Sequence, residues 1–215
     1  AINDIADIKT MSHLVKYDSI HGVLQRNIST ENETLVIDDL KFQFFHESDI
    51  SKLPWKALDI DFVIEATGKF KTTETAQLHL SAGAQKVILS APPEDDNIKT
   101  VVLGVNEHIL DGSENIISNA SCTTNNAAPM LKIIQELCGI EQAYITTVHS
   151  YTTDQSLHDQ PHKDLRRARG ASQSIIPTTT GAAKAITKIF PELDGKIGGC
   201  GIRVPVPDGS LTDIT

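Results

Sequence analysis

The sequence FVIEATG, residues 62–68, decides how the middle of the chain folds. Its first five residues form a short apolar run that is typical of a buried strand, and Thr67-Gly68 marks the end of that strand. Toward the C-terminus, residues 73–80 have the pattern of a helix that Gly83 closes, and residues 87–90 form a second strand. A strand, a helix and a strand in this order predict a parallel sheet covered by helices, which is an α/β fold.

Short strands and helices alternate along the rest of the chain as well. Before this unit, we expect two apolar strands joined as a hairpin at Asp38-Asp39. Beyond it, we expect three further strands and two helices, at residues 100–105, 116–117 and 143–148, and at residues 123–137 and 180–190. The character of the chain changes near residues 118–121, where we place the boundary between two domains, residues 1–121 and 122–215.

The composition excludes several classes of protein. The chain has 215 residues, of which 40% are hydrophobic and 22% charged. Its net charge of −9 argues against broad nucleic-acid binding, because an acidic surface repels phosphodiester backbones. No apolar run is long enough for a membrane helix, and the first residues lack a signal-peptide pattern. The three cysteines are odd in number and widely spaced, which argues against a disulfide framework or a metal site and favours the reducing cytoplasm.

Cys122 lies in the stretch SNASCTTN, residues 118–125, at the start of the helix expected over residues 123–137. The positive end of a helix dipole favours a thiolate, so this position suits a nucleophile. A free cysteine is more often buried and inert, but the small polar neighbours of Cys122 argue against that environment. Cys138 and Cys200 have apolar or glycine neighbours, and for them we expect the inert role.

His149 follows the strand expected at residues 143–148 and is a candidate base and acid for a thiol. The chain has eight histidines, and spacing alone does not pair His149 with Cys122. A basic cluster that contains Arg167, together with Arg203 and the helix start at Thr180-Gly181, suits phosphate binding. For each of these residues, an ordinary surface charge or helix cap is an equal alternative.

Asp4 follows two strand-like residues near the start of the chain. In a dinucleotide-binding unit, a carboxylate at the end of the second strand accepts hydrogen bonds from the adenosine ribose. The glycine-rich loop that precedes such an acid by about 20 residues does not occur in this sequence. Taken alone, Asp4 is therefore expected to be a turn or helix-cap residue.

Together these stretches resemble the phosphorylating glyceraldehyde-3-phosphate dehydrogenase family from residue 4 to residue 215. The resemblance is carried by YDS and HG, EATG, SNASCTTN, TTVHSYT, DLRRAR, IPTTTGAAKA and RVP, at residues 17–19, 21–22, 65–68, 118–125, 146–152, 164–169, 176–185 and 203–205. It implies a Rossmann-type NAD-binding domain without its first strand, glycine loop and helix, followed by part of an α+β catalytic domain. It also implies a homotetramer, in which the loop at residues 150–174 reaches a neighbouring subunit.

The resemblance further implies a mechanism and a set of site residues. Cys122 would attack the aldehyde of glyceraldehyde 3-phosphate, His149 would move the protons, NAD would take the hydride, and inorganic phosphate would release 1,3-bisphosphoglycerate from the thioester. Thr152 and Arg203 would hold the substrate phosphate. The attacking phosphate would be held by Ser121, Thr123, Arg167, Thr180 and Gly181. The cofactor would be held by Asp4, Thr67, Gly68 and Ser90.

The chain departs from the family in three ways. Asn126 replaces a second cysteine that does not react, and Ser48 replaces an arginine near the adenine, which puts that contact in doubt. The glycine loop of the family is also absent, so the pyrophosphate has no seat and we expect this chain by itself to have little or no activity. Since the chain starts without methionine and ends in a strand-like stretch, we expect it to be a fragment. Asp4 would repel the 2′-phosphate of NADP, which favours NAD.

Three alternatives to this function stay open from the sequence. Erythrose-4-phosphate dehydrogenase shares the Cys/His pair, although Ser150-Tyr151-Thr152 and residues 180–183 look more like the triose enzyme. A thiol hydrolase or acyltransferase would need the same pair without a nicotinamide. A binding module without catalysis is the third alternative, and the presence of Cys122 and His149 with their neighbours argues against it.

Overall fold

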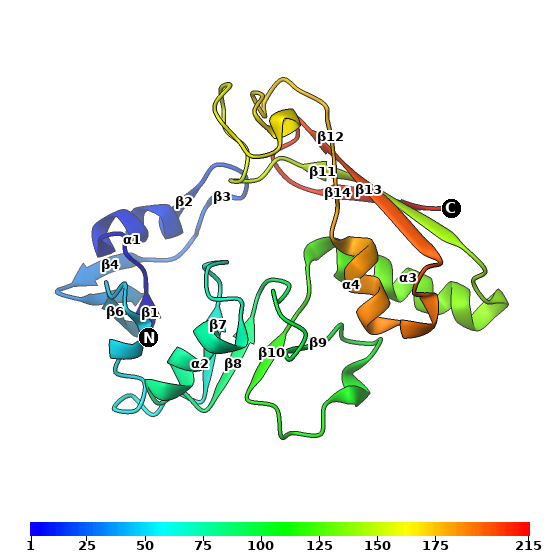
Figure 1. Cartoon of the computed structure of the whole chain (residues 1–215). Helices are drawn as coiled ribbons and strands as arrows, with labels where there is room; N and C mark the ends of the chain where they lie inside the picture. The colour runs from blue at the N-terminus through cyan, green and yellow to red at the C-terminus, as the bar shows by residue number, and fades with distance from the viewer. The chain divides into compact units, whose positions relative to one another are not determined.

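The computed structural model describes residues 1–215, which form two compact units. Unit 1 contains residues 1–61 and 78–85, and unit 2 contains residues 62–77 and 86–215. None of the helices in the chain is both long enough and apolar enough to span a membrane. Figure 1 shows the elements of both units.

Unit 1 is built on a four-stranded sheet with the strand order β1-β6-β5-β4. Its strands are β1 (Ile2–Asn3), β4 (Ile28–Glu31), β5 (Thr34–Ile37) and β6 (Leu40–Phe45), and β2 (Tyr17–Asp18) pairs with β3 (Gly22–Val23) in a separate hairpin. Strand β1 runs parallel to β6, whereas the other neighbours are antiparallel. The predicted hairpin at Asp38-Asp39 is confirmed, and Asp38 adopts the positive φ of 50° that aspartate tolerates in tight turns.

Helix α1 (Ile8–Lys16) belongs to unit 1 and was missed by the sequence analysis. Its N-cap is Asp7, whose side chain accepts a hydrogen bond from the backbone N–H of Thr10 at 3.0 Å. Ile8 packs with Leu35 and Phe44 in the core of the unit. Ile8, Met11 and Val15 recur at spacings of three and four, and the partly buried Met11 packs against the same core, so this short helix does carry a helical pattern.

Unit 2 begins with a parallel sheet in the order β7-β8-β10-β9, which confirms the predicted α/β class. The strands are β7 (Phe62–Glu65), β8 (Lys86–Leu89), β9 (Lys99–Thr100) and β10 (Ile116–Ser118). Helix α2 (Thr73–Ser81) connects β7 to β8, as the sequence predicts, and it crosses the division between the units. The carboxyl ends of β7, β8 and β10 lie on one edge of the sheet, because these strands are parallel.

The strand predicted at residues 100–105 is wrong beyond its first residue, because β9 ends at Thr100. The buried side chain of Asn106 accepts a hydrogen bond from the Val102 N–H at 2.8 Å and donates one to the Thr100 carbonyl at 2.9 Å. These backbone groups would otherwise extend the ladder. Val102 and Val105 are buried in a turn instead, where they join the core of unit 2.

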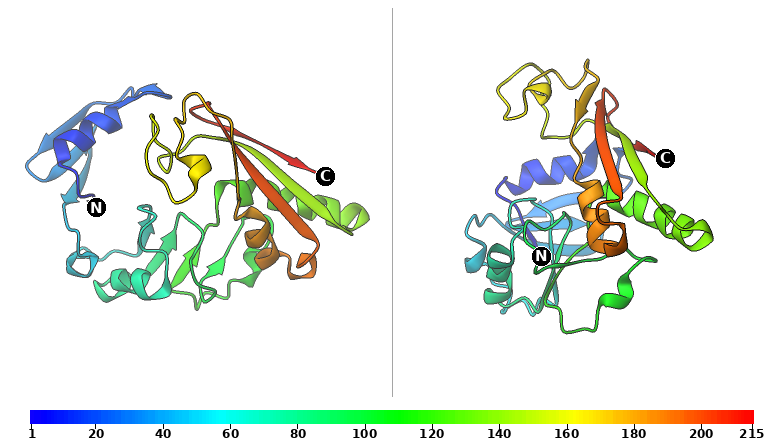
Figure 2. Two further views of the ribbon diagram at one scale, coloured as in Figure 1. Left: turned by 45° about the horizontal axis from the view of Figure 1, so that its top comes forward. Right: turned by 45° about the vertical axis from the view of Figure 1, so that its right-hand side comes forward.

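The second sheet of unit 2 has the order β12-β13-β11-β14. It consists of β11 (Ala143–Ser150), β12 (Ile176–Thr178), β13 (Ile197–Val204) and β14 (Ser210–Ile214). Strands β11 and β13 are parallel, and the outer two strands are antiparallel to them. Helices α3 (Cys122–Cys138) and α4 (Ala182–Ile189) contact each other and this sheet, as Figures 1 and 2 show.

A hydrophobic core between these helices and the sheet holds α3 in position. It contains Ala127, Leu131, Ile145 and Ile186, none of which is exposed to solvent. Pro129 lies inside α3, and Gly139 ends the helix with a positive φ of 71°. The core therefore holds the first turn of α3 beside the carboxyl end of β11.

Candidate active site

Cys122 is the first residue of α3, directly after the parallel sheet. Ser121 is the N-cap, and its hydroxyl accepts a hydrogen bond from the Thr124 N–H at 3.1 Å. The preceding residue, Ala120, is buried and adopts a positive φ of 58°, a conformation that is strained for alanine. This tight turn between β10 and α3 brings the sulfur of Cys122 to the positive end of the helix dipole, where a thiolate is favoured.

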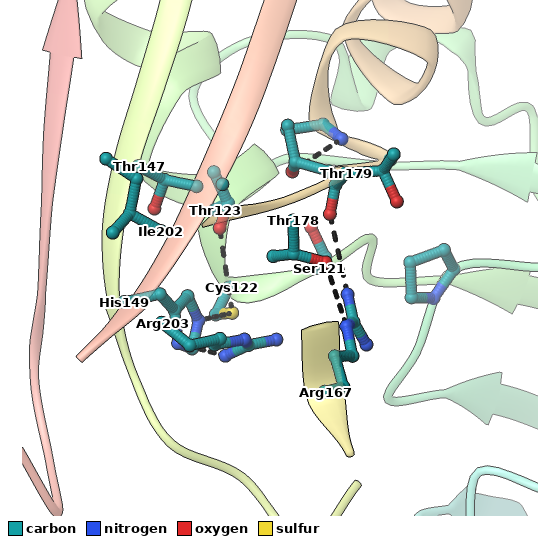
Figure 3. Close-up of a pocket in the computed structure, with 15 residues that line it drawn as sticks. Ser121, Cys122, Thr123, Thr147, His149, Arg167, Thr178, Thr179, Ile202 and Arg203 are labelled. Carbon is teal, nitrogen blue, oxygen red and sulfur yellow. Dashed lines mark hydrogen bonds between the residues drawn. The ribbon is translucent and has the colours of Figure 1, made fainter. Parts of the chain in front are cut away.

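His149 approaches the sulfur from β11. Its Nε2 atom lies 3.2 Å from Cys122 Sγ, and the two side chains face each other in Figure 3. The other ring nitrogen, Nδ1, lies 2.8 Å from the Ser150 carbonyl oxygen and also contacts Arg203 Nη1. The carbonyl can accept a hydrogen bond from a protonated Nδ1, whereas the guanidinium can donate one to an unprotonated Nδ1, so Nε2 can face the sulfur as an acceptor or as a donor.

Arg203 lies beside His149 because β11 and β13 pair in register, with His149 opposite Arg203. Its Nη1 atom donates a hydrogen bond to the Ser150 carbonyl at 2.8 Å. Burial, followed by the positive charge of Arg167, lowers the pKa of the Arg203 guanidinium, although Cys122 and Asp154 oppose this shift. Two neighbouring cations that are partly withdrawn from water make a site suited to an anion.

Arg167 enters the same site from the long loop that connects β11 to β12. Its Nε donates to the Thr178 hydroxyl at 2.8 Å, and its Nη1 pairs with the Asp154 carboxylate at 2.5 Å. The other oxygen of Asp154 lies 3.4 Å from His162 Nε2. The guanidinium is therefore held by two segments and is oriented before any ligand arrives.

The start of α4 supplies further groups for an anion. Gly181 is the N-cap and has no side chain to occupy the free backbone amides, and the Thr180 hydroxyl accepts a hydrogen bond from the Ala182 N–H at 3.2 Å. These residues line a cavity of about 250 Å³ together with the groups described above. Its lining includes Ser121, Cys122, Thr123, His149, Arg167, Thr180, Gly181 and Arg203. Figure 3 shows the arginines and the Cys122–His149 pair converging on this space.

A second group of predicted residues lies at the carboxyl ends of β7 and β8. The Ser90 N–H donates to the Glu65 carbonyl at 3.0 Å, which joins the two strand ends. The buried Glu65 carboxylate accepts a hydrogen bond from the Thr67 N–H at 2.7 Å, and Gly68 follows with a positive φ of 70°. Thr67, Gly68 and Ser90 are thus brought together at one edge of the parallel sheet.

Asp4 lies in unit 1, in the connection between β1 and α1. One of its carboxylate oxygens, Oδ1, accepts a hydrogen bond from the Ala6 N–H at 2.9 Å. Its own N–H donates to the Phe45 carbonyl at 3.0 Å, at the end of the neighbouring strand β6. Asp4 is therefore a turn residue, and its side chain lies at the carboxyl end of a parallel pair of strands.

Comparison with known proteins gives this arrangement a family. Residues 1–73 match the family model "Glyceraldehyde 3-phosphate dehydrogenase, NAD binding domain", and residues 121–215 match "Glyceraldehyde 3-phosphate dehydrogenase, C-terminal domain". The whole chain is 52% identical to glyceraldehyde-3-phosphate dehydrogenase of Mycolicibacterium smegmatis and covers 64% of that protein. The chain belongs to the glyceraldehyde-3-phosphate dehydrogenase family.

Two further relatives resemble this member of the glyceraldehyde-3-phosphate dehydrogenase family to a similar degree. The Borreliella burgdorferi enzyme is 50% identical over 220 residues, which include all of this chain and 65% of the relative. Glyceraldehyde-3-phosphate dehydrogenase 2 of Bacillus subtilis is 49% identical, and the chain covers 63% of it. The chain therefore spans just under two thirds of the length of these relatives.

Most residues that the family resemblance suggests for substrate binding line the one cavity, but Thr152 is not among its lining residues. The lining also includes seven residues that were not assigned to the site from the sequence: Pro92, Thr147, Thr178, Thr179, Ala182, Gly201 and Ile202. Thr147 could have been found, because alternation along β11 puts it on the same face as His149. The expected burial of Cys138 is wrong, since that thiol is exposed at the far end of α3, and Cys200 is partly exposed.

Proposed function

We propose that the protein that carries this chain is a phosphorylating, NAD-dependent dehydrogenase that oxidises glyceraldehyde 3-phosphate to 1,3-bisphosphoglycerate. The proposal rests on the 3.2 Å separation between Cys122 Sγ and His149 Nε2 in a cavity that two arginines line. A thiol beside an imidazole supplies a nucleophile and its base, and arginines supply forked contacts to phosphate. The names of the relatives support the same activity.

The first step is the addition of Cys122 to the aldehyde. His149 Nε2 accepts the thiol proton, the thiolate forms a C–S bond to the carbonyl carbon, and the oxygen receives the proton to give a hemithioacetal. The Cys122 N–H and the protonated Nε2 stabilise the negative oxygen while it forms. As hydride leaves the carbon, Nε2 takes the hydroxyl proton and a thioester remains on the sulfur.

The second step is the attack of inorganic phosphate on the thioester. A phosphate oxygen forms a bond to the acyl carbon, the C–S bond breaks, and Cys122 leaves as the thiolate with 1,3-bisphosphoglycerate as the product. The attacking phosphate is held by Ser121, Thr123, Arg167, Thr180 and Gly181. Thr152 and Arg203 hold the phosphate of the substrate itself. Support comes from the cavity lining, from which only Thr152 is missing.

NAD, when bound, supplies the acceptor for the hydride that leaves the hemithioacetal carbon. The residues at the carboxyl ends of β7 and β8 suit a dinucleotide, because Thr67 and Ser90 carry hydroxyls and Gly68 lacks a side chain that would block a ligand. In unit 1, Asp4 suits the adenosine ribose and disfavours the 2′-phosphate of NADP. These four residues hold the cofactor in our proposal.

We also propose that the protein is cytoplasmic and forms a homotetramer. We place its domain boundary between residues 121 and 122. The three thiols are all unpaired, which is compatible with a reducing compartment. The loop between β11 and β12 presents the apolar side chains of Leu157 and Leu165 to solvent, with exposed fractions of 72% and 81%, and a neighbouring subunit would cover them. Cys122 at the boundary is the first residue of α3.

An absorbance assay on the natural protein that carries this sequence tests the proposed function. NADH should accumulate only when glyceraldehyde 3-phosphate, NAD and inorganic phosphate are all present. Replacing the substrate with erythrose 4-phosphate should reduce kcat/KM. A higher kcat/KM for erythrose 4-phosphate would overturn the substrate assignment. Thioester hydrolysis without any dependence on NAD or phosphate would point to a thiol hydrolase instead.

A further inference from the structure

His46 lies directly beside Asp4 at the end of two paired strands. Strand β1 runs parallel to β6, with Asn3 opposite Phe45, so the next residues of the two strands are Asp4 and His46. The Asn3 side chain strengthens this junction, because it accepts the Glu47 N–H at 2.9 Å and donates to the Glu47 carbonyl at 3.0 Å. His46 therefore emerges at the same edge as the proposed ribose-binding carboxylate.

Both ring nitrogens of His46 face hydrogen-bond acceptors. Nδ1 lies 2.8 Å from the Ala6 carbonyl and 3.2 Å from the Asp4 carbonyl, and Nε2 lies 2.8 Å from a carboxylate oxygen of Glu33. A neutral imidazole carries only one N–H and would leave one of these acceptors facing a lone pair. The arrangement is satisfied only by the imidazolium, which donates from both nitrogens.

The charges around His46 favour the same state. The hydrogen bond to Glu33 raises the pKa of His46 most, and it outweighs the opposing effect of desolvation, while the Ala6 and Asp4 carbonyls add to the rise. Glu33 is the charged group that the ring faces. From β6 the ring is packed by Phe44, with ring centroids 5.0 Å apart, and from the β1–α1 connection it faces the backbone carbonyls of Asp4 and Ala6.

A short chain of hydrogen bonds connects the ring to the Asp4 carboxylate. His46 Nδ1 donates to the Ala6 carbonyl, and the Ala6 N–H donates to Asp4 Oδ1 at 2.9 Å. The turn that carries Asp4 is thus tied through its backbone to a titratable side chain. After loss of the proton, the His46 ring could donate a hydrogen bond to only one of Glu33 and Ala6, and the Asp4 carboxylate would be oriented less well.

We propose that His46, as an imidazolium held by Glu33, is a positioning residue for Asp4, so that affinity for NAD falls when His46 loses its proton. This inference rests on the proposed function, which gives Asp4 the ribose. The hydrogen bonds of the imidazolium are all present at pH values below the ordinary imidazole pKa of about 6.5. They are lost as the pH rises through the higher pKa of His46 in the folded protein, so affinity for NAD falls as the pH rises.

Calorimetric titration with NAD between pH 6 and pH 9 tests the proposal in the natural protein that carries this sequence. The dissociation constant should increase by about two- to tenfold across this range, as expected for the loss of one hydrogen bond. His46→Asn keeps a donor near the Nδ1 position but cannot be charged, and should remove most of this increase. Glu33→Gln keeps an acceptor without a charge, and should move the midpoint to lower pH.

Two further measurements separate the possible failures. NMR titration of the His46 ring should give a midpoint above about 6.5 in the wild type and a lower one in E33Q. His13→Asn, which removes an exposed ring from α1, is the matched control and should leave the pH dependence unchanged. A normal midpoint for His46, or an unchanged pH dependence in H46N, would overturn the inference while NAD still binds. Absence of NAD binding by the wild type at every pH would overturn the proposed function together with it.

Discussion

The Cys122 cavity and the Asp4 turn are built by different means. In the cavity, side chains contact one another directly, as in the Cys122–His149 pair and the hydrogen bond from Arg167 to Thr178. In the turn, the Ala6 N–H holds the Asp4 carboxylate, and His46 binds the carbonyl of the same residue. Substitutions in the cavity should therefore change the rate of reaction, and substitutions at the turn should change cofactor affinity.

The largest effect should come from Cys122→Ser. An alcohol is a far poorer nucleophile than a thiolate at neutral pH, so the oxidation rate should fall by roughly 10⁴-fold or more. The matched control is Cys138→Ser at the other end of the same helix, where the thiol is exposed and outside the cavity. The measurement is the burst of NADH in a single turnover, with NAD binding checked separately. A C122S protein that retains a near-normal burst would remove Cys122 from the mechanism.

His149→Asn should have the next largest effect, a loss of about 10²–10⁴-fold in kcat, which is the usual size of acid–base assistance. The dissociation constant for NAD should change little, because the ring contacts the sulfur and Arg203 rather than the strand ends of β7 and β8. The pH profile of kcat and rescue by added imidazole are the informative measurements. An unchanged pH profile would show that another group moves the proton.

The comparison also separates what the sequence could predict from what it could not. Strand β7 and helix α3 follow from apolar runs and from the glycine that ends α3, which are local signals. Helix α1 was missed although its signals are local, an Asp7 N-cap followed by apolar residues at helical spacing, and β9 was predicted too long because the Asn106 side chain takes its backbone groups. An apolar run is thus a good guide to a strand only where no nearby side chain competes for its backbone groups.

The same limit applies to the residues of the site. Cys122 stands out in the sequence, since small polar residues surround it at a helix start. The position of Arg203 beside His149 depends on the register of β11 and β13, which are 54 residues apart in the chain. Gly201 lines the cavity because of strand pairing as well. It lies so close to the neighbouring strand that an added Cβ would be 3.2 Å from the methyl group of Thr178. No local motif contains this information.

Asp4→Asn tests the other side of the comparison. Hydrogen bonds to a charged group contribute more than neutral ones, so the dissociation constant for NAD should rise by about tenfold or somewhat more while kcat at saturating NAD changes little. Asp7→Asn is the matched control, because asparagine replaces aspartate well as the N-cap of α1. Equal NAD binding by D4N and the wild type would show that the turn does not hold the ribose, and a tighter binding of NADP by D4N would support the role of Asp4.

The smallest effect should come from Asp154→Asn, which weakens the support of Arg167 without removing a group that we place on the substrate. The Michaelis constant for phosphate should rise by about three- to tenfold, because the ion pair of Arg167 with a carboxylate is replaced with a weaker hydrogen bond to an uncharged amide oxygen. The value of kcat at saturating phosphate should stay close to that of the wild type. Asp159→Asn, which breaks the exposed pair with Arg169 in the same loop, is the matched control.

The ion pair between Asp154 and Arg167 should respond to pH in the opposite direction to the hydrogen bonds of His46. Burial raises the pKa of Asp154, but the hydrogen bonds from Arg167 and His162 outweigh it and lower the pKa below its usual value. The ion pair should therefore be intact above the ordinary aspartate pKa of about 3.9 and be lost only as the pH falls through the lower value in the folded protein. Between pH 6 and pH 9, D154N and the wild type should differ in the Michaelis constant for phosphate by a constant factor, whereas H46N and the wild type should differ in NAD affinity by a factor that changes with pH. A ratio for D154N that changes within this range would mean that a group other than Asp154 controls Arg167.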